Sequence, residues 1–316
     1  MENQTVFHTL VLSGLSDLPS LQLPLFLVFL LVYLMTLTGN LLIVLLICTD
    51  SHLQTPMYFF LGTLACLDIS SSSVTTPRML FDLNTQKRII SLQACITQIY
   101  FFMFFVMSEV YLLAVMSYDR YIAICRPLHY VQIMHWKACV LLVSGVLISG
   151  MVYSLVQTLF LLKLTFCSSD TLQSFFCDLP QLLENSCSDT FINRLLMLFL
   201  GILLGMLIFV LTFSPYIILL KTIMKIQSKH MRSKAFSTCS SHFTVTLIFY
   251  VTGYFNYLNT NTNYRFVEDS RVTSVFYAVL TPLMNPIIYS LRNQDLKKSL
   301  KRALERPQIL GKSIIN

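Results

Sequence analysis

Long apolar stretches separated by short polar segments form the main pattern along the chain. Crossing roughly 30 Å of hydrocarbon takes about 20 apolar residues at about 1.5 Å of helical rise each. Seven stretches reach that length, and Asp68 and Glu109 are the two charged residues inside them. The stretches cover approximately residues 23–48, 57–76, 91–117, 138–162, 195–220, 235–257 and 272–291. The pattern predicts an all-α membrane protein, a bundle of seven transmembrane helices.

The composition supports this fold class. The chain is 55% hydrophobic and 12% charged with a mean hydropathy of +0.68, whereas soluble domains are about 25% charged. A soluble globular domain and a disordered chain are therefore excluded. The first stretch is too long for a signal-peptide core and lacks a basic flank before it, so we expect a retained helix. The sequence shows no repeat or second domain, and we expect an extracellular segment over residues 1–22, one helical domain over 23–291 and a cytoplasmic tail with an amphipathic helix over 292–316.

The positions of Lys and Arg indicate how the bundle is oriented. With the N-terminus outside, the cytoplasmic segments hold 15 of the 22 Lys and Arg residues. Cytoplasmic loops carry such an excess. The net charge of +7 therefore reflects orientation and contact with membrane lipids, and does not indicate a nucleic-acid partner. The same orientation places the sequon Asn3-Gln4-Thr5 in the secretory lumen, so we expect glycosylation of Asn3.

Four of the nine cysteines lie on the outer side in this topology. Cys95 begins the third span, and Cys167, Cys177 and Cys187 lie in the longest connection. An oxidising lumen favours disulfides, and four cysteines allow three pairings. Bonding the middle of the loop to the third helix would make the loop a lid, so we favour Cys95 with Cys177 and Cys167 with Cys187. We expect reduced thiols elsewhere, and no CxxC or histidine pairing supports a zinc site.

Five motifs occur in register with these spans. They are Gly39-Asn40, PMYFFL (56–61), MSYDRYIAIC (116–125), KAFSTC (234–239) and PLMNPIIY (282–289). Together they resemble the olfactory receptors, a family of rhodopsin-like G-protein-coupled receptors. Ser117 and Ser241 stand where alanine is commoner in that family. The resemblance implies an odorant receptor in the plasma membrane of sensory cilia that raises cAMP through a heterotrimeric G protein of the stimulatory olfactory type.

The third motif places an Asp-Arg pair at the cytoplasmic end of an apolar helix. A guanidinium there can pair with its neighbour at rest and reach into a cleft when the bundle opens. The alternative is an ordinary basic flank at the membrane interface. The resemblance implies that Arg120 gates the G-protein site. The expected switch and coupling residues are Asp119, Arg120, Tyr121, Tyr216, Lys234 and Tyr289.

Asp68 and Glu109 lie at similar depths in the bilayer. A carboxylate there is costly unless it is paired, protonated or bound to a cation. Helical rise places Asp68 about 18 Å and Glu109 about 16 Å from the inner face, and Asn40 and Asn285 fall in the same half. These four residues could hold a sodium ion or share a proton. The alternative is a hydrogen-bonded core that only fixes helix packing, and we expect no other cofactor or metal.

Inward-facing residues in the outer half of the bundle are the candidates for ligand binding. They are Phe102, Met103, Phe105, Val106, Met107, Leu200, Gly201, Leu204, Tyr250, Gly253, Tyr254, Tyr257, Val275 and Val279. The outer part of the third span has no Asp for an amine, and the seventh has no Lys for a retinal Schiff base. The set therefore predicts small neutral volatile ligands, oriented by the hydroxyl groups of Tyr254 and Tyr257.

The sequence argues against two other classes of protein, enzymes and channels or transporters. No Gly-rich phosphate loop, HExxH or GxSxG motif occurs, which argues against an enzyme. A channel or transporter would show internal repeats and helices broken at mid-membrane, which the sequence does not suggest. A rhodopsin-like receptor for a lipid or peptide stays open as an alternative, although the PMYFFL and KAFSTC motifs disfavour it.

Overall fold

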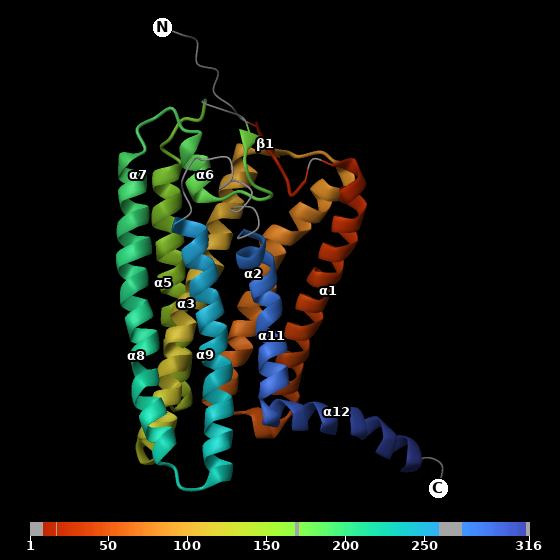
Figure 1. The fold of residues 1–316 in the computed structure, drawn as a ribbon, viewed down its shortest axis with the longest axis vertical. Coiled ribbons are helices and arrows are strands. Elements are labelled where there is room, and N and C mark those ends of the chain that lie inside the picture. The colour runs from red at the N-terminus through yellow and green to blue at the C-terminus, as the bar shows by residue number, and fades with distance from the viewer. Residues whose placement is uncertain (1–8, 17, 168–170, 259–273, 314–316) are drawn as a thin grey trace.

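The computed structural model describes residues 9–16, 18–167, 171–258 and 274–313, which form a bundle of long helices (Figure 1). In chain order the long helices are α1 (Pro19–Thr49), α2 (Pro56–Thr85), α3 (Leu92–Cys125), α5 (Trp136–Leu161), α7 (Phe191–Leu196) with η3 (Met197–Leu203) and α8 (Leu204–Lys225), α9 (Lys229–Leu258), and η4 (Phe276–Leu280) with α11 (Thr281–Arg292). Within the described residues, five are long and apolar enough to cross a membrane: α1, α2, α3, α5 and the continuous helix over 191–225.

Several helices extend beyond the apolar stretches that predict them. Helix α1 begins at Pro19 and not near residue 23, because proline suits the first turn, where its missing N–H has no helical partner. Helix α2 continues past residue 76 to Thr85 and ends at Gln86 in the left-handed conformation, with φ of 55°. Hydrophobicity marks the part of a helix suited to hydrocarbon, whereas backbone hydrogen bonding continues into the polar interface. The apolar stretches therefore locate the helices, and α1 and α2 extend beyond the predicted ends.

Two segments in the outer part of the bundle are wound as π-helix, η3 in the fifth long helix and η4 in the seventh. Such segments shift the side chains that follow them and often occur at functional sites. No sequence pattern predicts them here. Pro215 lies inside α8 and Pro286 inside α11, where each removes a helical hydrogen bond.

A small sheet covers part of the outer end, which the all-α expectation does not include. Strand β1 (Thr9–Leu12) pairs antiparallel with β2 (Ile89–Ser91) and parallel with β3 (Thr171–Leu172). The guanidinium of Arg88 donates to the backbone carbonyls of Ser13 and Ser16. Strands of two to four residues are too short to give an alternating pattern, so the sequence could not predict them.

The long outer loop is held by the two disulfides that the sequence favours. Cys95 and Cys177 are bonded with their Cα atoms 5.4 Å apart, and Cys167 and Cys187 with theirs 5.7 Å apart. Cys95 and Cys177 are both completely buried, so the middle of the loop is attached directly to α3. The same loop contains the short helix α6 (Leu179–Glu184). The other five cysteines are free thiols.

Gly150 allows α5 to approach α3 closely. A Cβ at this position would lie 3.0 Å from the Phe104 carbonyl oxygen and would collide with Ser108 Oγ. Ser108 Oγ donates to that same carbonyl at 2.7 Å, so neither group is free to move away. We expect Gly150→Ala to lower the free energy of unfolding by about 1–3 kcal/mol, as an added methyl group does in a packed core. The melting temperature of the purified receptor measures the effect.

Gly145→Ala on the same helix is the matched control, because a Cβ there would meet nothing within 4 Å. We expect it to leave the melting temperature unchanged or to raise it slightly, since alanine favours helix. An equal loss of stability in both variants would contradict close packing at Gly150.

At the inner end the chain forms η1 (Ser51–Leu53), η2 (Pro127–His129) and α4 (Tyr130–Ile133), and α12 (Gln294–Ser313) then leads away from the bundle (Figure 1). Arg302 pairs with Asp50 at 2.6 Å and holds α12 against the first connection. Leu296 is buried against the bundle, whereas Leu304 is 66% exposed. A helix therefore occurs in the tail, where the sequence predicts an amphipathic one.

Candidate functional site

A small cavity lies at the inner end, next to the Asp-Arg motif. Residues of α2, α3, α9 and α11, together with Asn293, line it: Met57, Leu61, Met116, Arg120, Ser241, His242, Tyr289 and Asn293. Arg120 is therefore directed into a space between helices and not only toward the membrane interface. Such a space could admit a segment of a partner protein if the helices moved apart.

Arg120 is held by its neighbour in this conformation. Its Nη2 lies 3.0 Å from Oδ2 of Asp119, which is completely buried. The Tyr130 hydroxyl of α4 donates to the other carboxylate oxygen at 2.9 Å. Burial, and then the charge of Asp119, raise the pKa of Tyr130, so its hydroxyl stays protonated at neutral pH and continues to donate. Arg120 and Tyr130 thus share one carboxylate, each through a different oxygen, so Asp119 holds the guanidinium and α4 together.

Two tyrosines that the sequence assigns to the switch lie close to this cavity. Tyr289 lines it directly, and Tyr216 is linked to it because its hydroxyl is hydrogen-bonded to Nδ1 of His242. In the described part of the chain, the Tyr289 hydroxyl and Nε2 of His242 are buried without a hydrogen-bond partner. Both groups are therefore available to a new partner if the cavity opens. Tyr121 is half-buried on α3 and does not line the cavity.

Sequence reasoning missed His242 and Tyr130. His242 follows the KAFSTC motif in an otherwise uncharged span, and this isolated imidazole is the signal that could have identified it. Tyr130 lies in the short helix α4, and no local pattern predicts that this segment folds back onto α3. The side chain of Lys234, a predicted coupling residue, lies outside the described side chains.

The four residues of the expected polar core lie near one another at the middle of the bundle. Asn285 donates to both oxygens of Asp68 at 2.9 Å, and Ser71 donates to Glu109 at 2.9 Å. Asp68 and Glu109 are 0% and 2% exposed and interact electrostatically. Asn40 lies to one side and donates to the carbonyl of Pro282, which joins α1 to α11. These residues are distant in sequence, and they lie close together because they occupy similar depths along their helices.

Carboxylate and hydroxyl oxygens dominate this cluster, and they are the ligands that Na⁺, like other hard cations, prefers. Among the described residues no group of three or more His, Cys, Asp or Glu side chains could hold a metal.

The predicted ligand residues divide between two apolar clusters, the larger of which extends through the bundle to its inner end. Phe102, Val106 and Val279 belong to the larger cluster. The Phe102 ring lies 5.2 Å from the ring of Phe176 in the outer loop and 5.8 Å from that of Tyr277. The lid thus packs directly onto the expected ligand region. Tyr277 is a residue that sequence reasoning missed, because it lies in the π-helical turn.

The second cluster joins α3 to α5, η3 and the outer loop. It contains Met103 and Tyr153, with Met107 and Leu200 packed against it at partial burial. Methionine side chains are flexible, so this cluster can adapt to ligands of several shapes.

The other predicted ligand residues differ in how deeply they are buried and in what they contact. Phe105, Leu204 and Val275 are half-buried against the larger cluster, and Tyr250 is hydrogen-bonded to Thr212 at 3.4 Å. Gly253 lies against the Tyr277 ring, whereas Gly201 is exposed. The side chains of Tyr254 and Tyr257 lie outside the described side chains, and Asn3 lies outside the described residues.

The arrangement of the helices is similar to that of a rhodopsin. The crystal structure of squid rhodopsin superposes with a TM-score of 0.70, covering 93% of this chain and 88% of that chain at 18% sequence identity. This likeness concerns the fold. It agrees with the bundle that the apolar stretches predict.

Sequence comparison then gives the family. A family model described as olfactory receptor matches residues 29–306. Olfactory receptor 8G17 of Mus musculus is 44% identical over 303 residues, covering 96% of this chain and 99% of the relative. Olfactory receptor 8G1 of Homo sapiens is 44% identical over 309 residues, with 98% and 99% covered, and olfactory receptor-like protein OLF4 of Canis lupus familiaris is 45% identical over 300 residues, with 95% and 97% covered.

The chain belongs to the olfactory receptor family. It is thus a multi-pass membrane receptor and not an enzyme, as its motifs predict. The family implies an odorant ligand and a G protein as partners, and it favours neither a channel nor a receptor for lipids or peptides.

Proposed function

We propose that this receptor binds small neutral volatile molecules in the outer half of the bundle and activates a heterotrimeric G protein of the stimulatory olfactory type, which raises cAMP. The observation that supports this most is the position of α3. Its outer half carries Met103, Val106 and Met107, which pack against the other expected ligand residues, and its inner end carries Arg120 in the cavity. One helix can therefore transmit a change from the ligand to the G protein.

The proposed topology places all seven long helices across the plasma membrane of sensory cilia. The extracellular part is residues 1–22, the receptor domain residues 23–291 and the cytoplasmic tail residues 292–316. Both disulfides lie at one end, and Arg120 and the basic helix α12 lie at the other, which supports this orientation. Exposed Lys297, Lys298 and Lys301 of α12 would lie against anionic lipid headgroups.

The ligand gains mostly from the burial of apolar surface, at about 25 cal/mol per Å². No described member of the expected ligand set carries a charge, so a permanent ion would lose its hydration without a partner. A hydroxyl group such as that of Tyr277 or Tyr153 adds about 1 kcal/mol net when it bonds to ligand oxygen. We therefore expect oxygen-bearing volatiles of micromolar potency, and several related agonists.

A matched chemical series tests the ligand class. Cells expressing the receptor are exposed to an alcohol, a ketone, a carboxylate and an amine of one chain length, and cAMP is measured against concentration. We expect the alcohol and the ketone to be the best agonists. Met107→Ala should weaken both by roughly tenfold, because a fully buried methionine contributes about 1.5–3 kcal/mol and Met107 is half-buried before the ligand covers it.

Met206→Ala is the control, because Met206 lies on the neighbouring helix α8 but is 53% exposed. We expect its dose responses to match those of the wild type. If the charged amine or carboxylate is the best agonist and Met107→Ala has no effect, the ligand binds elsewhere.

Two clusters of polar residues would maintain the resting conformation. At the inner end, Asp119 holds Arg120 until helix movement lets Arg120 meet the hydroxyl of Tyr289 or the Tyr216–His242 pair. In the middle, Asp68 and Glu109 would share a proton or a sodium ion. A sodium ion there would offset one of the two negative charges and so stabilise the conformation that brings the carboxylates together.

We expect Glu109→Gln to change cAMP production in the absence of ligand, because it removes a charge that accepts a hydrogen bond from Ser71. Replacing sodium in the medium with choline should alter this basal activity in the wild type and have no effect in Glu109→Gln. Glu184→Gln, at an exposed position in the outer loop, is the control. An unchanged basal level in Glu109→Gln would leave packing as the only role of this carboxylate.

A further inference from the structure

The side-chain amide of Gln98 bonds to two other segments at the outer end of the bundle. Gln98 follows Cys95 on α3 by three residues and is 8% exposed. The backbone N–H of Cys177 in the outer loop donates to its Oε1 at 3.0 Å. Its Nε2 donates to the Val74 carbonyl of α2, also at 3.0 Å. One side chain therefore joins α2, α3 and the lid.

A carboxamide suits both of these contacts. The N–H of Cys177 needs an acceptor and the carbonyl of Val74 needs a donor, and glutamine carries one of each at the end of its side chain. A glutamate of the same length would present two acceptors, one of which would face the Val74 carbonyl. Both polar atoms of Gln98 thus bond within the protein, so this residue positions other segments.

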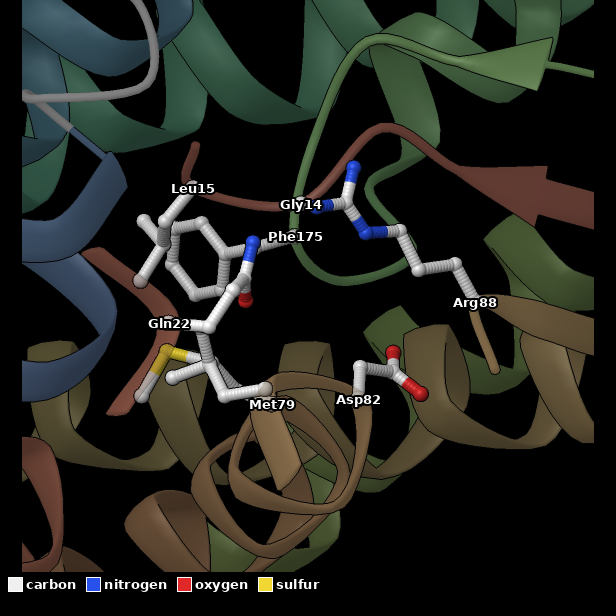
Figure 2. A pocket seen from close by; sticks show the side chains of 8 residues that line it. Gly14, Leu15, Gln22, Met79, Asp82, Arg88 and Phe175 are labelled. Carbon is white, nitrogen blue, oxygen red and sulfur yellow. The ribbon is translucent and has the colours of Figure 1, made fainter. Parts of the chain in front are cut away.

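Two aromatic rings of the lid come directly before the contact with Gln98. Phe175 and Phe176 are 1% and 0% exposed. The Phe176 ring lies 5.2 Å from the Phe102 ring and covers the expected ligand region. Phe175 lies instead with Leu15 around a small space next to the N-terminal segment (Figure 2). The position of the lid backbone therefore decides where the Phe176 ring lies.

The other attachments of the lid leave this part of its backbone some freedom. The Cys95–Cys177 bond attaches a side chain, and rotation about the bonds of that side chain lets the backbone turn. The N-terminal segment holds the lid through the pairing of β1 with β3 and through the N–H of Gly14, which donates to the Ser174 carbonyl at 3.2 Å. The phenylalanines lie between these two attachments. Gln98 restrains the backbone itself, directly after the Phe176 ring.

We propose that Gln98 is a positioning residue that fixes the Phe176 ring over the ligand and so determines which lengths of ligand the receptor accepts. This inference rests on the proposed odorant site and goes beyond it, because Gln98 is outside the predicted ligand set. With the amide in place the ring stays against Phe102, and a ligand must fit beneath it. Without the amide the ring moves outward, so long ligands gain room and short ligands lose a contact.

Hydrogen exchange tests the positioning without any ligand or G protein. The full-length receptor is purified in lipid nanodiscs, and exchange of the backbone amides in lid peptides is followed by mass spectrometry. Gln98→Met keeps the side-chain length and removes both polar groups. We expect the lid amides around Cys177 to exchange about three- to tenfold faster than in the wild type, as the loss of one such hydrogen bond allows. Exchange in α5 should stay the same.

Gln93→Met is the matched control, because Gln93 is exposed on the first turn of the same helix. We expect its lid amides to exchange at the wild-type rate. Equal exchange of the lid in Gln98→Met and the wild type would overturn the proposal. If Gln98→Met does not fold, Gln98→Asn keeps the amide but is one methylene too short to reach both partners, and the same outcomes apply.

A series of straight-chain alcohols tests the effect on the ligand. Cells expressing each receptor are matched for surface labelling, and cAMP is measured against concentration. We expect Gln98→Met to weaken the shortest agonist by about threefold or more and to make a longer homologue the most potent. A loss of folded receptor alone would lower all responses and leave the preferred length unchanged. Gln93→Met should keep the wild-type preference.

Phe176→Ala shows whether Gln98 acts through this ring. It should shift the preference toward longer alcohols by itself, and adding Gln98→Met should cause no further shift, because the two changes affect the same contact. A further shift in the double variant would overturn the proposal, and so would an unchanged preference in Gln98→Met. If no alcohol raises cAMP in the wild type, the proposed function fails on that class, while hydrogen exchange still decides whether Gln98 positions the lid.

Discussion

Replacing Arg120 with alanine should abolish odorant-evoked cAMP production while the receptor still reaches the cell surface. The Arg120 side chain lines a cavity and contacts Asp119, so its removal takes away a polar contact and leaves the apolar core intact. The G protein would lose the one guanidinium group in the described lining of this cavity. We expect the maximal response to fall by at least about tenfold, since a hydrogen bond to a charged group contributes about 1.5–3 kcal/mol.

Arg126→Ala is the matched control, because Arg126 follows α3 but is exposed and lies outside the cavity. Surface labelling of all three receptors separates signalling from expression. Normal signalling by Arg120→Ala at equal surface expression would mean that this residue is only a basic flank of the membrane.

Replacing Cys95 with serine should prevent most of the receptor from reaching the surface. The Cys95–Cys177 bond closes a loop with a sequence separation of 82 residues. By loop-closure entropy, such a bond stabilises the folded protein by about 4.5 kcal/mol. That is a large part of the free energy of unfolding of a typical native protein, roughly 5–15 kcal/mol. The lid over Phe102 would also lose its attachment to α3. Flow cytometry of an N-terminal tag measures the surface fraction.

The double replacement of Cys95 and Cys177 should be no worse than either single one, because both remove the same bond. Cys167→Ser should have a smaller effect, since its bond closes a separation of 20 residues and contributes about 3.3 kcal/mol on the same basis. Normal surface expression of Cys95→Ser would contradict the role given to this disulfide.

Much of this structure could be predicted from hydrophobicity and helical rise. Apolar length located the helices, because a bilayer sets a minimum span. Depth along those helices brought Asp68, Glu109 and Asn285 together, since each lies a known number of turns from a helix end. The outer disulfides followed from the compartment and from the need to attach the loop to α3.

The sequence could not predict features that depend on contacts between distant segments. The outer sheet forms from three short strands that have no local pattern, and the π-helical turns that place Tyr277 depend on packing. In the sequence, Gln22 is a polar residue at the start of an apolar helix. It is buried because the N-terminal segment folds over α2, which no local pattern indicates. His242 was missed because a single imidazole in a span has many structural explanations.

GTP uptake by a purified G protein is the sharpest test of whether this receptor couples a neutral volatile ligand to the inner cavity. The full-length receptor in lipid nanodiscs is mixed with a heterotrimer of the stimulatory type, and uptake is followed with and without an agonist found in the chemical series. We predict that the agonist accelerates uptake with the wild type and has no effect with Arg120→Ala. Acceleration that is equal in both receptors, or absent with every neutral volatile that raises cAMP in cells, would contradict this coupling.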